Sequence, residues 1–274
     1  KELFGQQVNL PVEGKEFVSS LKAQMEKAIA DTDNTFLENQ FVRIVNNEPV
    51  ISKIEKIKYP EQKKEIEDLI SERLEPINIL DIITDTDYWL KWTKHFGLLS
   101  GHESKMENPT ARYILSTFCY GCNIGPTQTV RSLEELTRKH LSWTNQQHIT
   151  EDKIDKAVFQ LINAYNSLDL PRVWGSGKRS STDGTKWDLY DKNLLSEYHI
   201  RYGGYGGIGY YHVSDKYIAL FSRFIPCGTW EGVYLLDILQ NNKSEIQPDT
   251  FHGDTQSQNG PIFGLSYLLG INLM

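Results

Sequence analysis

Apolar positions in the first two-thirds of the chain repeat with the 3.6-residue period of amphipathic helices. The clearest helix begins after Thr150, an N-cap residue followed by two acidic side chains, and we expect it to end at Leu170-Pro171. The same period predicts helices over residues 15–32, 61–74 and 80–96, the last with an aromatic stripe packed in the core. β-Branched residues on both sides of an Asn-Asn turn predict a hairpin over residues 42–51.

The pattern changes near residue 173, beyond which β-branched and aromatic runs predict strands. We expect a first strand that ends at Asp183, and then a hairpin over residues 208–225. A helix over 229–241, a strand over 250–254, a helix over 262–269 and an apolar strand over 271–274 complete the order. In the ribonuclease-H-like fold, which begins with this order, the first and fourth strands are neighbours. We therefore expect an α+β or α/β chain, mainly helical at first and then forming a truncated ribonuclease-H-like mixed sheet.

Composition and charge narrow the class of protein. The 274 residues carry a formal charge of −7, and residues 171–274, with 9 basic and 10 acidic side chains, contribute only −1 of it. Neither part has the basic surface of a free-standing nucleic-acid-binding protein. There is no apolar run near the ~20 residues that cross a bilayer, no signal peptide, and only three cysteines. We expect a protein of the reducing cytoplasm and, because the chain lacks an initiator Met and ends on an apolar strand, a piece of a larger one.

Three motifs are formal matches that we interpret as structural. Cys119 and Cys122 form a CxxC, but no second pair exists, so we expect reduced thiols packed in the helical region without zinc. Residues 204–209 match GxGxxG, but a strand-like run follows where a dinucleotide site needs a helix, so we expect a glycine-rich start to a hairpin. Ser180 and Ser181 lie in no GxSxG elbow.

Two aspartates are the remaining candidates for chemistry. Asp183 and Asp254 lie 71 positions apart at the ends of expected strands, beside Gly184 and Gly253. If the first and fourth strands are neighbours, the two carboxylates meet, and carboxylate oxygens suit Mg²⁺ and two-metal phosphoryl transfer. Asp next to Gly is also an ordinary turn sequence. Asp188 is a rival first ligand, although in one strand it faces away from Asp183.

From about residue 80 to its end, the chain resembles the Tn-three family of replicative transposases, which are DDE enzymes. The similar segments are Leu80 to Gly101, Phe118 to Thr129, His148 to Tyr165, Trp174 to Tyr190, Tyr198 to Pro226, and Pro248 to Met274. Residues 1–79 resemble the more variable, mostly helical upstream part of the family. We therefore expect a helical region over 80–172 and an incomplete catalytic core over 173–274.

The resemblance implies a DNA-cleaving enzyme of the bacterial cytoplasm, with no membrane partner. Its catalytic aspartates correspond to Asp183 and Asp254, which bind Mg²⁺, or Mn²⁺ in its place. Together they nick DNA at transposon ends and join the 3′-hydroxyls to target DNA. The third acid of the family, a glutamate beyond the second aspartate, has no counterpart before Met274, so we expect this chain alone to be inactive. We also expect it to self-associate, because no further strand covers the apolar edge at residues 271–274. The candidate DNA contacts are Lys178, Arg179, Lys186, Arg201 and His252.

Two other hypotheses remain open at this stage. The chain could be a non-catalytic, truncated DNA-binding or regulatory protein of a transposon. It could also be an unrelated metal-dependent nuclease with the same core. The gene's surroundings distinguish these hypotheses, because an open frame beyond Met274 favours the enzyme and flanking inverted repeats favour a transposon.

Overall fold

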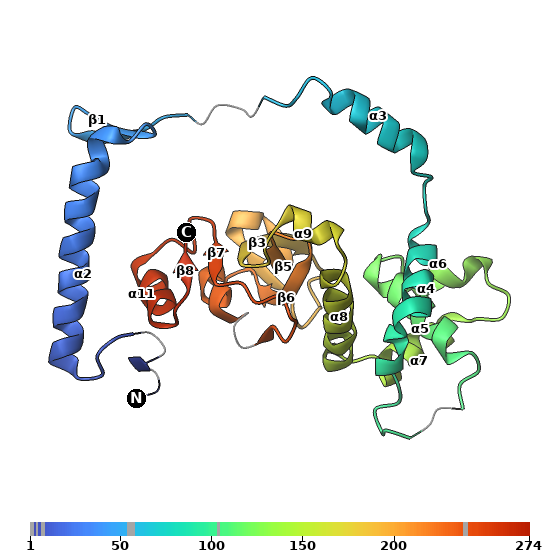
Figure 1. Ribbon diagram of the computed structural model, residues 1–274. Helices are drawn as coiled ribbons and strands as arrows, with labels where there is room; N and C mark the ends of the chain where they lie inside the picture. The colour runs from blue at the N-terminus through green and yellow to red at the C-terminus, as the bar shows by residue number, and fades with distance from the viewer. Residues whose placement is uncertain (1–2, 4, 7–8, 54–57, 103–104, 238–240) are drawn as a thin grey trace. The chain divides into compact units, whose positions relative to one another are not determined.

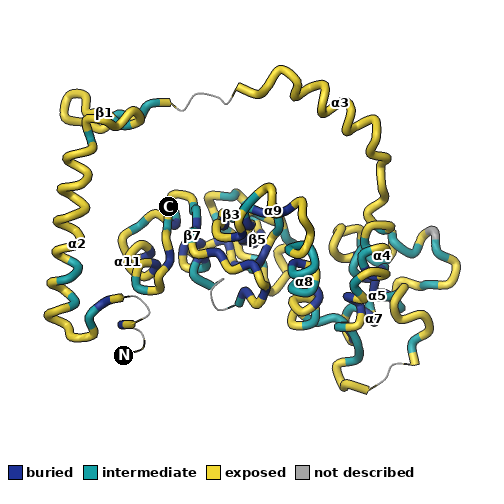
Figure 2. The backbone as a smooth tube through the Cα atoms, in the orientation of Figure 1, coloured by how far each residue is buried: buried dark blue, intermediate teal, exposed yellow. Residues whose placement is uncertain are grey.

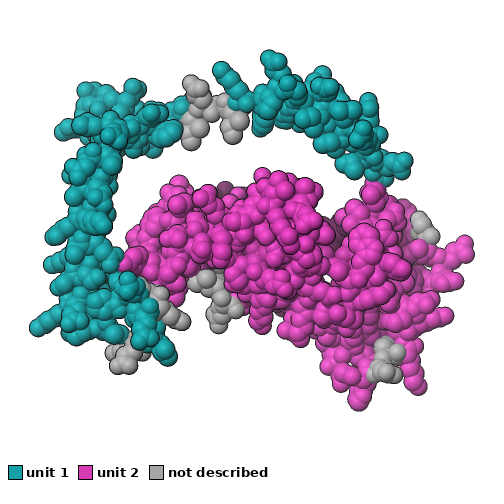
Figure 3. All heavy atoms as spheres, in the orientation of Figure 1, with its two compact units in different colours: residues 1–76 teal, residues 77–274 magenta. Residues whose placement is uncertain are grey.

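The structure is a computed structural model that describes residues 3, 5–6, 9–53, 58–102, 105–237 and 241–274. The chain divides into two compact units, Lys1–Pro76 and Ile77–Met274, which are coloured separately in Figure 3. Within the described ranges, no helix is long and apolar enough to cross a membrane.

The first unit consists of isolated elements with little packing between them. Its elements are α2 (Gly14–Thr35), η1 (Phe36–Glu38), β1 (Val42–Val45), β2 (Glu48–Ile51) and α3 (Lys63–Arg73). These confirm the predicted helices and the hairpin, whose turn residues Asn46 and Asn47 have φ values of 52° and 66°. Positive φ at both positions gives a turn that matches the twist of the paired strands. Neither α2 nor α3 buries a residue, and both are almost entirely exposed in Figure 2.

The second unit begins with a helical region (Figure 1), which packs around a small apolar core. Trp92, Ile114 and Ala157 form that core, with Phe96 packed against it. The elements are α4 (Ile79–Leu90), η2 (Trp92–His95), α5 (Pro109–Gly121), α6 (Pro126–Thr129), η3 (Val130–Ser132), α7 (Arg138–His148), α8 (Glu151–Asn166) and α9 (Leu170–Trp174).

The single helix expected over residues 80–96 is wrong, because the chain breaks it at Lys91. This residue has the left-handed φ of 55°, and its N–H donates to the Asp87 carbonyl at 2.7 Å, which ends α4. The break turns Trp92 into the core and leaves Tyr88 and Trp89 73% and 72% exposed. The aromatic stripe is therefore only partly core, contrary to the prediction.

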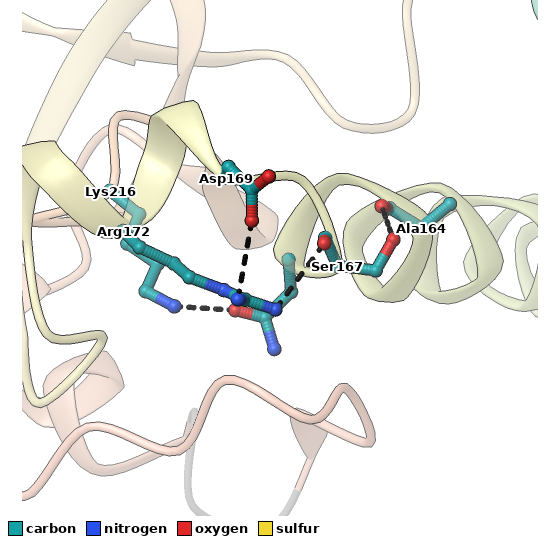
Figure 4. A network of polar contacts seen from close by, with 6 residues as sticks. Ala164, Ser167, Asp169, Arg172 and Lys216 are labelled. Carbon is teal, nitrogen blue, oxygen red and sulfur yellow. Dashed lines mark hydrogen bonds and ion pairs between the residues drawn. The ribbon is translucent and has the colours of Figure 1, made fainter.

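The expected end of the long helix at Leu170-Pro171 is also wrong. The helix α8 ends at Asn166, and Pro171 lies in the first turn of α9, where its missing N–H costs nothing. Figure 4 shows the polar network at this corner, in which Arg172 donates to the Asp169 carboxylate at 3.3 Å. In the same network the Lys216 ammonium donates to the Asn166 side chain at 2.5 Å and ties α8 to the turn between two strands of the sheet.

The rest of the second unit is a six-stranded mixed sheet with short helical segments. The elements are β3 (Arg179–Asp188), β4 (Glu197–His199), η4 (Ile200–Tyr202), β5 (Gly204–Ser214), β6 (Ala219–Pro226), η5 (Glu231–Leu236), β7 (Thr250–His252), α11 (Gly260–Leu268) and β8 (Asn272–Leu273). The sheet order is β4-β5-β3-β7-β8, and β6 also pairs with β5. The strands β3, β5 and β6 are antiparallel neighbours, whereas β7 runs parallel to β3, and β8 parallel to β7.

Most elements predicted for this part are confirmed, with several differences. The strand expected over 250–254 ends at His252, so Asp254 lies beyond it, and the short strand β4 was not predicted. The strand β3 does not end at Asp183 but continues for five residues, because its pairing with β5 extends to Asp188. Of the helix expected over 229–241, the structure describes the 3₁₀ segment η5, and residues 238–240 lie outside the described residues.

The core of the sheet lies on one of its faces. Ile162 of α8 packs there with Leu220 of β6, Leu235 of η5 and Phe251 of β7, each at most 1% exposed. The helix α8 and the segment η5 therefore cover the same face, and α8 connects the helical region to the sheet.

Candidate functional site

Asp183 lies on β3, and Asp254 lies two residues beyond the end of β7, the parallel neighbour of β3. The register pairs Ser181 of β3 with His252 of β7, and both aspartates lie two residues further along their chains. Because parallel strands advance in the same direction, this register brings Asp254 alongside Asp183. The segment between them, residues 184–253, includes β4, the β5–β6 hairpin, η5 and β7.

Both aspartates are exposed. Along β3 the buried Ser180 and Thr182 alternate with exposed Ser181 and Asp183, as a strand with one covered face requires. A Cβ atom at Gly253 would collide with Ser257 and contact Leu235, so this position packs closely against the covered side of the sheet. The next residue, Asp254, is exposed.

Each aspartate uses one carboxylate oxygen for a local hydrogen bond. Asp183 Oδ1 accepts from the N–H of Gly184 at 2.8 Å, and Asp254 Oδ1 accepts from the N–H of Gln256 at 3.0 Å. Among the described residues, neither aspartate forms an ion pair with a basic side chain. The second oxygen of each side chain is thus available to a ligand.

The rival carboxylate, Asp188, is engaged elsewhere. It pairs with Lys186, whose ammonium lies 2.5 Å from Asp188 Oδ1. The same ammonium lies 5.9 Å from the centre of the Tyr202 ring. This pair lies at the far end of β3 from its junction with β7, which places Asp188 away from Asp254.

A third carboxyl group, which no pattern in the sequence predicts, lies close to the two aspartates. Glu231 begins η5 and is only 9% exposed. Burial raises the pKa of the Glu231 carboxyl, and the negative charges of Asp254 and Asp183 raise it further. Arg201 and a hydrogen bond with Gln256 act in the opposite direction. The sequence gives no sign of this position, because only the tertiary fold brings η5 to the two strands.

The backbone of β3 comes close to the Glu231 carboxyl group at Gly184, a residue without a side chain. A Cβ atom at Gly184, directly after Asp183, would collide with Glu231 Oε2. A residue with any side chain at this position would push the carboxyl group away from β3. The glycine that stands beside the first aspartate is therefore explained by close packing rather than by a turn.

The hydroxyl group of Tyr210 is buried next to these acids. Tyr210 pairs with Gly184 across β3 and β5 and is 2% exposed. Burial raises the pKa of its phenol, and the charges of Glu231 and Asp254 add to the rise, whereas nearby hydroxyl groups oppose it. No group in the described part of the chain accepts from or donates to this hydroxyl with good geometry.

The five candidate DNA contacts differ in exposure. Lys178, Arg179 and Arg201 are exposed, and the Arg201 charge reaches Glu231. Lys186 is half-buried and bound to Asp188, and His252 is half-buried in β7, where its carbonyl accepts from Thr182 Oγ1 at 3.4 Å.

The oxygen atoms of the two aspartates are suitable ligands for a hard divalent cation, but they are too few to enclose one. Asp183 and Asp254 offer carboxylate oxygens, the ligands that Mg²⁺ prefers. They also concentrate negative charge, since both raise the pKa of Glu231. However, nowhere in the described ranges do three His, Cys, Asp or Glu side chains come close enough to enclose an ion directly. The site therefore suits an ion that is held by two aspartates and keeps several waters.

The glycine-rich run and the CxxC motif, which we interpreted as structural, lie in a strand and at the end of a helix. Residues 204–209 lie within β5, which confirms that the glycine-rich run begins a hairpin. Cys119 is buried in α5, but Cys122 is exposed, so the expectation that both are packed is wrong for Cys122. All three cysteines are free thiols.

Comparison with known proteins identifies relatives for most of the chain. A profile described as the Tn3 transposase DDE domain matches residues 81–274. The transposase for transposon gamma-delta of Escherichia coli (strain K12) is 26% identical over 95% of this chain and 27% of its own length. The transposase for transposon Tn1546 of Enterococcus faecium is 27% identical over 77% of this chain and 22% of its own length. The transposase for transposon Tn501 of Pseudomonas aeruginosa is 29% identical over 77% and 21%, respectively. The chain thus spans about a quarter of the length of these curated relatives.

Proposed function

Because the chain belongs to the family of the Tn3 transposase DDE domain, we propose that it contributes part of the catalytic centre of a transposase. That enzyme nicks DNA at transposon ends and joins the exposed 3′-hydroxyls to target DNA. The observation that carries the proposal is the pair of exposed aspartates, Asp183 on β3 and Asp254 just beyond the end of the adjacent parallel strand β7. The curated relatives are transposases by name, which supports the same reaction for the longer protein.

We propose further that the sheet is ribonuclease-H-like. Apart from the three-residue strand β4, the first three strands of the sheet are β3, β5 and β6, which are antiparallel neighbours, and the fourth, β7, lies parallel beside β3. This arrangement supports the proposal because it makes the first and fourth strands neighbours and brings the two aspartates together.

In the proposed reaction, Asp183 and Asp254 hold a divalent cation, Mg²⁺ or Mn²⁺, through their free carboxylate oxygens. Such an ion activates the attacking oxygen and stabilises the leaving oxygen in phosphoryl transfer. The two local hydrogen bonds, from Gly184 and Gln256, hold each carboxylate in position before the ion arrives. The exposed charges of Lys178, Arg179 and Arg201 contact DNA phosphates.

Transposition of a marked element in cells tests this function. The gene that encodes this chain is supplied unaltered or with Asp183→Asn, Asp254→Asn or the matched control Asp188→Asn. We expect the first two variants to abolish transposition and the control to retain it, because Asp188 is bound to Lys186. Retention with Asp183→Asn or Asp254→Asn would contradict the proposal. Transposition without the gene would instead favour a regulatory protein.

A further inference from the structure

The site contains a buried carboxyl group that the family's pair of aspartates does not account for. Glu231 precedes Asp254 in the chain, so it is distinct from the family's third acid, which follows the second aspartate. It is 9% exposed and forms no ion pair with a basic side chain in the described ranges. A buried carboxylate without a paired cation is costly, and proteins retain one where a cation binds or a proton is held.

The Glu231 carboxyl group packs closely against the segments that follow the two aspartates. Its Oε2 atom lies against Gly184, at the point of β3 that directly follows Asp183. Its carboxyl group also contacts Gln256, two residues beyond Asp254. Glu231 therefore connects the two strand segments that carry the aspartates.

The Tyr210 hydroxyl is an independent observation at the same place. It is buried, it lies near Glu231 and Asp254, and it has no hydrogen-bond partner of good geometry in the described part of the chain. Buried polar groups are nearly always bonded, and the neighbouring hydroxyls of Thr182 and Ser257 reach this one only with poor geometry, so a ligand oxygen can complete its bonding. Water bound to a cation is such an oxygen.

We infer that Glu231 is a third acid of the Asp183–Asp254 site and holds a divalent cation there through the ion's own water molecules. Contact through water agrees with the spacing of the acids, because no three acidic side chains in the described ranges can enclose an ion directly. Mg²⁺ keeps several waters when one or two carboxylates bind it. Glu231 is thus a positioning residue, and the inference rests on the proposed function because it assumes that the aspartates bind the ion.

The inference is tested by titrating the whole 274-residue chain with Mn²⁺. The electron paramagnetic resonance signal of the free ion measures how much Mn²⁺ remains unbound. Glu231→Gln keeps the size and removes the charge, and we expect it to weaken Mn²⁺ binding by about 10- to 100-fold, as changes to outer ligands do. Asp183→Asn is expected to remove the site, and Asp188→Asn, which removes a charge from the same strand, is expected to leave Mn²⁺ affinity unchanged.

Thermal unfolding without metal separates this role from a merely structural one. Glu231→Gln removes the repulsion between Glu231 and the two aspartates, so the metal-free variant should unfold no earlier than the unaltered chain while binding Mn²⁺ more weakly. A second variant, Gly184→Ala, keeps the carboxyl group but displaces it, and should weaken binding in the same way. In the Glu231→Gln background, Gly184→Ala should add little, because both changes act on one group.

The outcomes for Glu231 and for the aspartates are distinguishable. If Glu231→Gln binds Mn²⁺ as tightly as the unaltered chain while Asp183→Asn does not, the inference is overturned and the proposed site stands. If the unaltered chain shows no binding that depends on Asp183, the proposed site is overturned and the inference with it.

Discussion

The buried His212 makes a quantitative prediction for the pH dependence of stability. His212 lies on β5 and is fully buried among the rings of Tyr210, Phe221 and Phe251, whose centres lie 5.3, 5.9 and 6.2 Å from its own. Burial lowers the pKa of its imidazole from 6.5 to about 4, although the backbone of Tyr234 and the charge of Asp237 act in the opposite direction. The folded chain therefore holds His212 neutral under conditions where the unfolded chain protonates it.

The sign and size of the effect follow from this difference. Above pH 6.5 the imidazole is neutral in both states and costs nothing, whereas between pH 6.5 and 4 the unfolded state binds the proton first. At pH 4.5 this difference lowers the free energy of unfolding by about 2.5 kcal/mol relative to pH 7, at 1.36 kcal/mol for each pKa unit. Below pH 4 the loss levels off, because the folded state also becomes protonated.

Urea unfolding at pH 7 and at pH 4.5, monitored by circular dichroism, measures the decrease in the free energy of unfolding. The variant His212→Gln cannot titrate, so we expect the unaltered chain to lose about 2.5 kcal/mol more than the variant on acidification. The matched control, His102→Gln at an exposed position, should lose as much as the unaltered chain. If His212→Gln and the unaltered chain lose stability equally, His212 is protonated in the folded state without cost and the reasoning is wrong.

Three further outcomes follow from burial and from the site. Phe251→Ala, at a fully buried position in the core of the sheet, should lower the free energy of unfolding by about 3–5 kcal/mol in urea titrations, whereas Tyr190→Ala, at an exposed position, should change it by less than about 0.5 kcal/mol. A thiol reagent should modify Cys122 in the native chain and reach Cys119 and Cys227 only in denaturant; equal native rates at all three would refute the burial argument. The chain incubated with transposon-end DNA and Mg²⁺ or Mn²⁺ should leave both strands intact, since the site binds one ion and in-line phosphoryl transfer uses two. Cleavage that disappears in both Asp183→Ala and Asp254→Ala would show that this chain needs no further acid.

Local patterns in the sequence predict the elements whose formation depends on local chemistry. The hairpin around Asn46-Asn47, the helix α11 with its C-terminal Gly270 and the β5–β6 hairpin are all confirmed. The break at Lys91 could not be predicted in this way, because the apolar period continues through it and a single left-handed residue redirects the chain. The extension of β3 beyond Asp183 likewise depends on its partner β5, which no pattern within β3 reveals.

The same distinction applies to the candidate site. The aspartates could be chosen because each stands at a strand-like segment beside a glycine, and the resemblance to a family weighted that choice. No local sequence pattern identifies Glu231. Its raised pKa and its place near the aspartates come from packing against Gly184 and from the charges of Asp183 and Asp254, which are distant in sequence. A carboxyl group of this kind is found only when the fold shows which side chains surround it.

The pairing of β3 with β7 also has a consequence for the order of events during synthesis. The two strands are joined by a long intervening segment, so Asp183 leaves the ribosome well before Asp254, with only one half of the site formed. Non-local parallel pairing forms slowly, because the loop must close before the contacts repay its entropy. The nascent chain therefore cannot hold an ion between the aspartates until the hairpin and η5 have folded. Cation binding that depends on both aspartates would then report that the sheet has reached its native topology.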